Sequence, residues 1–83
     1  MPLFMDVHRS LPAEAGPAEI AGAHAADLRV QERYATRYLN YWFDPAARTI
    51  FCLVEAPDAA SAAAVHREAH GLVADEIYRV EQG

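Results

Sequence analysis

Apolar and polar positions alternate in some parts of the chain and recur at helical spacing in others. Alternation with aromatic and β-branched residues predicts strands over residues 3–8, 36–44, 48–56 and 76–82. Helical spacing predicts helices over residues 18–34 and 58–70, the second with Asp58 as N-cap and Gly71 just beyond its end. This order of elements is that of the ferredoxin-like fold, an α+β fold with a four-stranded antiparallel sheet (order 4-1-3-2) and two helices on one face. We therefore expect a single domain that spans residues 1–83.

The two middle strands of the predicted sheet are apolar on both of their faces. Their alternating side chains are Leu39, Tyr41 and Phe43 against Tyr38 and Trp42, and Ile50, Cys52 and Val54 against Phe51 and Leu53. An antiparallel sheet with one face in water normally alternates between apolar and polar residues. Two-sided apolarity therefore predicts that a second sheet covers the open face, most simply that of another copy of the chain. We expect a homodimer with Tyr41 and Phe51 at its contact.

Composition and charge narrow the classes of function. The chain has 83 residues, 53% of them hydrophobic, and a formal net charge of -5. The negative charge argues against binding to nucleic acid or to an anionic membrane surface, and no apolar run is long enough to span a membrane. Cys52 is the only cysteine, which rules out an intrachain disulfide and a thiolate-rich zinc site. We expect a soluble cytoplasmic protein that gains stability from a partner or a ligand, because so short a chain buries little surface.

Two histidines four positions apart end the second predicted helix, in the motif HREAHG. Side chains at i and i+4 lie on one helix face about 5–6 Å apart at Cβ, so His66 and His70 can converge on one cation. The predicted topology brings His8, at the end of the first strand, to the same end of the domain as Asp75 and Glu76. Imidazole and carboxylate ligands suit nickel, copper, zinc or ferrous iron better than magnesium or calcium. The alternative is that His66 and His70 are only a helix C-terminal pair stabilised by the helix dipole.

The face occupied by His8 is a difficulty for a shared metal site. Simple alternation places His8 with Asp6, on the face of the sheet that we expect to lie away from the helices. His8 then reaches His66 only if the strand twists or ends there. A second hypothesis is a separate polar site on the sheet, formed by Asp6 and His8 with one or more of Asn40, Tyr38 and Trp42.

Other residues with reactive side chains have simpler explanations. We expect His24, three residues before Asp27 on the first helix, to be a buried histidine held by a hydrogen bond. Cys52 lies among apolar residues of a strand, where a cysteine is typically a small core residue. The chain has no glycine-rich phosphate loop, nucleophile elbow or paired-carboxylate motif, so its sequence favours no particular enzymatic reaction.

Five sequence blocks carry a resemblance to a known family. They are MDVH, AHAADL, YLNYWFD, FCLVEAPD and VHREAHGLVADEIYRVE, and together they extend over nearly the whole chain. They resemble the small bacterial nickel-binding, nickel-responsive proteins of ferredoxin-like fold, which form dimers and have long been classified as a domain of unknown function. The resemblance implies a metal-binding protein, with nickel as the metal. It also implies metal ligands from His8, His66 and His70, together with Asp6 and Glu76.

Three classes of function therefore stay open. In the first, a dimer binds nickel or a similar divalent ion, such as zinc or copper, for buffering, sequestration or response to the metal. In the second, the chain is a small dimeric enzyme like the ferredoxin-like monooxygenases, whose substrate pocket between sheet and helices is lined by Asp6, His8, Asn40 and Trp42. The third is a plain interaction module, because one fold carries many functions.

Overall fold

Four strands and two helices follow one another in the order that the sequence predicts. The computed structural model describes residues 1–83. Its strands are β1 (Leu3–His8), β2 (Arg37–Asp44), β3 (Thr49–Glu55) and β4 (Glu76–Val80), and its helices are α1 (Pro17–Val30) and α2 (Ala59–Ala69). The first helix is shorter than predicted, because the chain tightens into a 3-10 turn, η1 (Gln31–Tyr34), before β2 begins.

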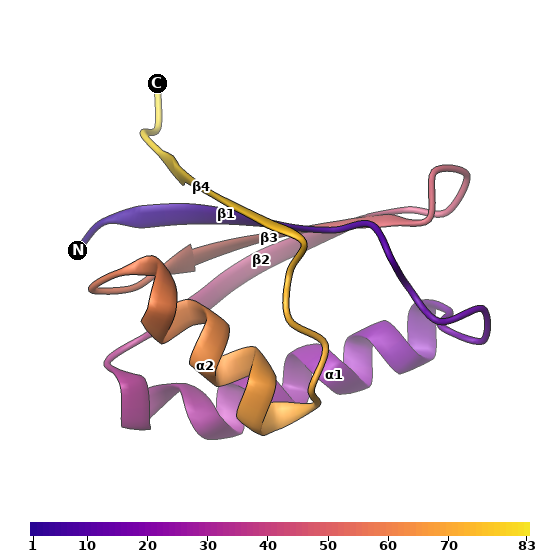
Figure 1. Ribbon diagram of the computed structural model, residues 1–83, viewed down its shortest axis with the longest axis horizontal. Helices are drawn as coiled ribbons and strands as arrows, with labels where there is room; N and C mark the ends of the chain where they lie inside the picture. Colours follow the sequence, from indigo (N-terminus) through magenta and orange to yellow (C-terminus); the bar gives the residue numbers. More distant parts are fainter.

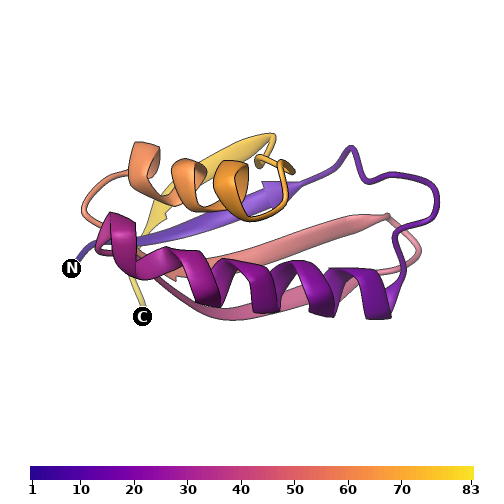
Figure 2. The ribbon, with the colours of Figure 1, turned by 90° about the horizontal axis from the view of Figure 1, so that it is seen from below.

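The strands form one antiparallel sheet in the order β2-β3-β1-β4. Both helices lie on one face of this sheet, and the other face is bare (Figure 1, Figure 2). We call these the covered face and the bare face. The arrangement confirms the predicted α+β ferredoxin-like fold. Neither helix is long and apolar enough to cross a membrane.

Local capping sets where α2 begins and ends, and thereby where its two histidines lie. The Asp58 carboxylate accepts a hydrogen bond from the Ser61 amide at 2.8 Å, as an N-cap does. At the other end Gly71 has a φ of 81°, a left-handed conformation that glycine adopts without strain and that ends the helix. The last turn therefore buries His66 and leaves His70 as the C-cap residue.

Strand β1 turns Asp6 and His8 toward the helices, so the expectation that they lie on the bare face was wrong. Asp6 pairs in register with Cys52 and His8 with Ile50, and all four residues are buried. The side chains that alternate with them and take the bare face are Leu3, Met5 and Val7. A central strand with apolar residues on both faces carries no alternation signal that fixes its orientation. The orientation follows from Asp6, whose polar partners all lie on the covered face.

A β-bulge in β2 changes which of its side chains share a face. The pairing with β3 shifts between Tyr38 and Asn40, so β2 uses one additional residue at Leu39. As a result Tyr38, Tyr41 and Phe43 all lie on the covered face, whereas simple alternation places Tyr38 opposite the other two. Tyr41 therefore packs under the helices, and the expectation that it lies at a contact with a second sheet was wrong.

The core lies between the helices and the covered face. Its buried apolar residues are Phe4, Ile20, Tyr38, Ile50, Cys52, Val54, Ala56, Ala62 and Val65. Four buried residues with ionisable polar side chains accompany them, namely Asp6, His8, Asp27 and His66. Such groups are rarely buried unless they are paired or bind an ion. Their partners therefore decide what this region of the molecule can do.

Candidate metal centre

His66 lies at the centre of the buried polar cluster. It projects from the last turn of α2 toward the sheet, and its side chain is 1% exposed. Each of its ring nitrogens lies beside a carboxylate oxygen: Nε2 is 2.9 Å from Asp6 Oδ2, and Nδ1 is 2.9 Å from Asp27 Oδ1. The imidazole therefore joins β1 to α1 through the middle of the domain.

On the Nε2 side, the hydrogen bonding of Asp6 and His66 is incomplete. Tyr38 donates its hydroxyl proton to Asp6 Oδ2 at 2.5 Å. His66 Nε2 is near the same oxygen but is not aligned for a hydrogen bond, and Asp6 Oδ1 has no partner at all. A buried polar atom without a partner costs about 1–3 kcal/mol. The free oxygen of Asp6, together with His66 Nε2 once that nitrogen has lost its proton, would form a pair of ligand atoms for a cation.

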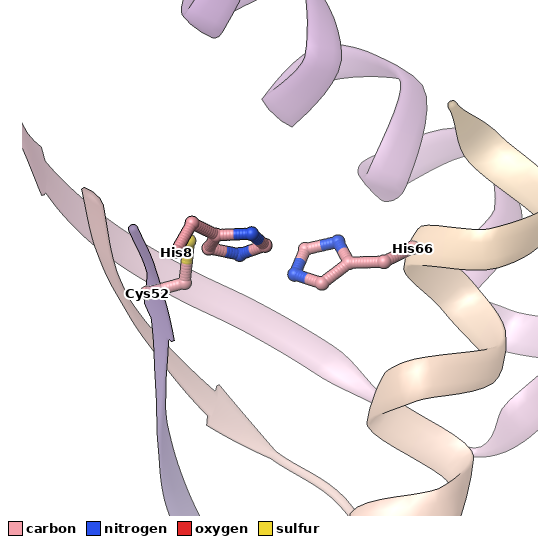
Figure 3. A group of neighbouring side chains, drawn as sticks. All are labelled: His8, Cys52 and His66. Carbon is pink, nitrogen blue, oxygen red and sulfur yellow. The ribbon is translucent and has the colours of Figure 1, made fainter. Parts of the chain in front are cut away.

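His8 and Cys52 complete this side of the cluster (Figure 3). His8 belongs to β1 and Cys52 to β3, whereas His66 comes from α2. The rings of His8 and His66 point toward each other from the sheet and the helix, edge to face, with their centroids 4.9 Å apart. One ring nitrogen of each histidine and the Cys52 sulfur all lie within 4.8 Å of one another. Three ligand atoms from three elements therefore surround one small space.

On the Nδ1 side, Asp27 joins His66 to His70. Asp27 Oδ1 is 2.9 Å from His66 Nδ1 and 3.0 Å from His70 Nε2. The Leu72 amide donates to His70 Nδ1 at 3.1 Å, so a neutral His70 carries its proton on Nε2 and donates it to Asp27. Asp27, His66 and His70 form a second group of potential ligands, but their facing atoms already bond to one another.

The two carboxylates hold His66 as an imidazolium. Burial alone lowers the pKa of a histidine, but the interactions with Asp27 and Asp6 outweigh it and raise the pKa of His66 to about 11. Burial likewise raises the pKa of the Asp27 carboxyl, yet its hydrogen bonds with His66 and His70 leave that pKa below its usual value. At neutral pH His66 is therefore protonated and Asp27 is ionised.

His8 has the opposite electrostatic character. Burial, together with the neighbouring positive charge of His66, lowers the pKa of His8 to about 4. His8 is therefore neutral at pH 7 and has a lone pair available for a metal ion. Burial raises the pKa of the Cys52 thiol, and burial with the charge of Asp6 raises the pKa of Tyr38, so both of these groups keep their protons.

Nearly the whole chain is similar to proteins of one family. The profile of the nickel-responsive proteins that are similar to SCO4226 matches residues 4–80. The chain belongs to this family. Its structure superposes on the crystal structure of SCO4226 from Streptomyces coelicolor A3(2) with a TM-score of 0.88 and 40% sequence identity, over 98% of each chain. A comparison with curated protein sequences finds no match.

Membership of this family confirms the resemblance seen in the five sequence blocks. The structure brings together most of the residues that the resemblance singles out. His8, His66 and Asp6 meet on the Nε2 side, and the ring centroid of His70 is 4.9 Å from that of His66. The four side chains come from β1 and from the end of α2, as the predicted topology requires.

Glu76 and Asp75 lie outside this cluster. Glu76 pairs in register with Val7, which places it on the bare face, and its carboxylate binds the Arg9 guanidinium at 2.5 Å. Asp75 is exposed and accepts hydrogen bonds from the amides of Arg9 at 2.5 Å and Ser10 at 3.2 Å. Both carboxylates connect the end of β1 to the start of β4 instead of reaching the histidines.

Sequence reasoning does not identify Asp27 or Cys52 as members of the cluster. Asp27 turns toward His66, whereas we expected it to hold His24; the ring of His24 instead lies against Tyr41, with the centroids 4.8 Å apart. A carboxylate at a core-facing helix position needs a buried partner, and this signal could have identified Asp27. Cys52 is buried as expected, but no sequence pattern separates a core cysteine from one beside a ligand group.

The hypothesis of a polar site on the sheet is right in one contact only. Tyr38 binds Asp6, but Asn40 and Trp42 lie on the bare face, on the other side of the sheet.

The Nε2 side of His66 fits a divalent transition metal better than the Nδ1 side. In metal sites a ligating histidine usually donates its other N–H to a carboxylate, which fixes the orientation of the ring. His66 has this arrangement, because Nδ1 lies against Asp27 while Nε2 lies beside the Asp6 carboxylate, whose Oδ1 has no hydrogen-bond partner. A neutral His8 supplies a second imidazole. Imidazole nitrogens with a carboxylate oxygen form a ligand set that suits nickel, zinc or copper.

Proposed function

We propose that this protein binds a divalent transition metal, nickel in the first place, through His66 Nε2, His8 and Asp6. The family description names nickel responsiveness, and the donor chemistry agrees with it. His70 and Asp27 orient His66 from the other side of its ring, and the Cys52 sulfur lies within 4.8 Å of a ring nitrogen of His8 and of His66. Bound metal of this kind serves buffering, sequestration or response, and a small domain that encloses one ion suits each of these roles.

The observation that carries the proposal is the pair of buried atoms without hydrogen-bond partners, Asp6 Oδ1 and His66 Nε2. They lie beside a histidine that stays neutral at pH 7. A histidine buried only for packing would have both nitrogens satisfied, because an unmade buried hydrogen bond is costly. A metal ion removes this cost.

The alternative of a monooxygenase-like enzyme gains no support from the comparisons. Its pocket requires Asn40 and Trp42 beside Asp6 and His8, and these two pairs lie on opposite faces of the sheet.

We also propose that the protein is a homodimer through the bare face. Trp42 and Tyr78 lie on this face, on the two edge strands of the sheet, and are 51% and 50% exposed; the half-buried Phe51 and Leu53 lie between these edges on β3. Large apolar side chains that gather on a surface exposed to water are unfavourable, and the bare face of a second copy of the chain would cover them.

Calorimetric titration with nickel at pH 7.5 tests the metal site. We expect His8→Ala to weaken binding by at least about tenfold, or about 1.4 kcal/mol, because it removes one ligand. His70→Ala should weaken binding less, because His70 orients His66 only through Asp27. The control is His24→Ala, a histidine of the same domain that lies against Tyr41 outside the cluster.

Three results of this titration would count against the proposal in different ways. Absence of nickel binding by the wild-type protein would refute it entirely. A larger loss in His70→Ala than in His8→Ala would move the ion to the Nδ1 side of His66. Equal losses in His8→Ala and His24→Ala would show that the cluster does not hold the ion.

A further inference from the structure

A cavity of about 70 Å³ lies between α1, the covered face of the sheet and the segment that follows α2. The cluster residues His8, Cys52, His66, His70 and Asp27 form one part of its wall. Most of the remaining wall is apolar and comes from Leu11, Ala15, Ile20, Ala23, Ile50 and Leu72. One side of an ion held by the cluster would therefore face this mostly apolar cavity.

The cavity is accessible from the surface and has room for a small ligand. Leu72 is 40% exposed and Glu19 is exposed as well, so the cavity reaches solvent between α1 and the segment after α2. A cavity that holds one water molecule has a volume of about 10–15 Å³, so this cavity accommodates roughly five non-hydrogen atoms. An apolar wall offers water few hydrogen bonds, whereas an apolar ligand body gains by burial there.

Charge and wall chemistry indicate what such a ligand would be. The carboxylates of Asp6 and Asp27 already balance the two charges of a divalent ion, so an anionic ligand would leave an unbalanced negative charge in a region shielded from water. A neutral donor avoids this cost. The rings of His24 and Tyr41, 4.8 Å apart on the cavity wall, offer aromatic surface to a flat ring.

We propose that this cavity binds a neutral, single-ring nitrogen heterocycle of the size of imidazole, whose ring nitrogen reaches the ion held by the histidine cluster. This inference rests on the proposed metal binding and adds to it a second, exogenous ligand. One coordination position of the metal would then hold an exchangeable ligand, as in metal sites where protein side chains do not fill every position. Metal and heterocycle would each strengthen the binding of the other.

The test is a titration of imidazole into the nickel-loaded protein, followed by calorimetry and by the nickel absorption spectrum. Ala23→Leu fills the cavity from its wall, and Ala21→Leu makes the same change at an exposed position of the same helix. We expect Ala23→Leu to weaken imidazole binding by at least about tenfold and Ala21→Leu by less than about twofold. Acetate, which is anionic, and benzimidazole, which is too large, should bind the wild-type protein much more weakly than imidazole does.

The nickel titration of each protein is carried out first, so that failure of the metal site is seen separately from failure of the cavity site. Nickel binding without any imidazole effect would overturn the cavity proposal alone. Equal imidazole affinity in Ala23→Leu and Ala21→Leu would overturn it as well. If Ala23→Leu does not fold, the ligand series decides, and benzimidazole or acetate binding as tightly as imidazole would refute the proposal. Imidazole binding that is unchanged when nickel is removed would refute the link to the ion.

Discussion

In a small domain the face of a sheet that packs against helices is normally apolar and its open face polar. Both faces of this sheet depart from that pattern. The covered face, which should be apolar, buries Asp6, His8 and His66 in its middle. The bare face, which should be polar, exposes about half of Trp42 and of Tyr78. Burying ionisable side chains and exposing large apolar side chains are both unfavourable. This difference agrees with the two proposals, that the covered face holds an ion inside the chain and that the bare face contacts a second copy.

The strands make this division possible because alternate residues point to opposite faces. Within β1, Asp6 and His8 alternate with Met5 and Val7, so one strand supplies both the polar cluster and part of the apolar bare face. A change on one face should therefore leave the other largely unaffected. Substitutions on each face test this independence.

Replacing His66 by Leu should destabilise the metal-free protein by about 3–5 kcal/mol. The substitution removes the imidazolium between Asp6 and Asp27 and leaves buried carboxylates without their positively charged partner. Urea denaturation at pH 7 in the presence of a chelator measures the loss. The matched control is His24→Leu, which removes a half-buried histidine with no carboxylate partner in the cluster and should cost far less. Equal losses in the two variants would mean that the cluster contributes no electrostatic stabilisation.

Acidification should destabilise the metal-free protein through His8. Its pKa is about 4 in the folded protein against an ordinary value of 6.5, so its contribution to stability is fully present above pH 6.5 and is lost as the pH falls toward 4. The loss between pH 7 and 4 amounts to about 3 kcal/mol at 1.36 kcal/mol per pKa unit. His66 has the opposite sign, because its raised pKa makes its contribution complete below pH 6.5 and removes it only as the pH rises through about 11.

The variant His8→Gln isolates this effect. Comparing its urea stability at pH 7 and pH 4 with that of the wild-type protein removes the contributions of all other groups. The variant should lose about 3 kcal/mol less than the wild-type protein over this range. A pH dependence identical to that of the wild-type protein would exclude His8 as the acid-sensitive group.

On the bare face, replacing Trp42 by Glu should separate the proposed dimer into monomers. A large aromatic residue at the centre of an interface typically contributes at least about 2 kcal/mol to association. Sedimentation of the wild-type and variant proteins at micromolar concentration measures the change. Leu28→Glu, which places the same charge at a 45% exposed leucine of α1, should leave the dimer intact. A wild-type protein that sediments as a monomer would remove the need for a partner on this face.

The sequence predicts the fold well because each of its signals is local. Hydrophobic spacing, the N-cap at Asp58 and the glycine at position 71 determine the elements one at a time, and their order alone indicates the topology. The bulge at Leu39 is not visible in this way, since one extra residue in a strand has no signature of its own. It places Tyr38 and Tyr41 on the same face, whereas simple alternation puts them on opposite faces.

The site is harder to predict because its contacts are long-range. The spacing of His66 and His70 identified one helix face, and the topology brought His8 to it. Asp27 lies 39 positions away from its partner His66, and nothing local to α1 reveals that contact. For Glu76 the predicted end of the sheet is correct, but the predicted proximity to the histidines is not. The alternation of side chains along β4 places Glu76 on the bare face.

The smallest effect that we predict concerns the protons released when nickel binds. His66 is an imidazolium in the metal-free protein up to about pH 11, and nickel needs the lone pair of its Nε2. His8 is already neutral and releases nothing at pH 7. One proton should therefore leave per nickel ion, and affinity should rise about tenfold, or about 1.4 kcal/mol, for each pH unit above neutrality. Calorimetry in buffers of different ionisation enthalpy counts this proton.

The proton count also shows whether Cys52 ligates the ion together with His66. The Cys52 thiol keeps its proton in the metal-free protein, so a second released proton would identify Cys52 as an additional thiolate ligand. The control variant Cys52→Ser should still release one proton if His66 is the group that loses it. Release of no proton by the wild-type protein would mean that His66 stays an imidazolium between its two carboxylates. The covered face would then hold its buried charge for stability, and the ion would have to bind without the residue at the centre of the cluster.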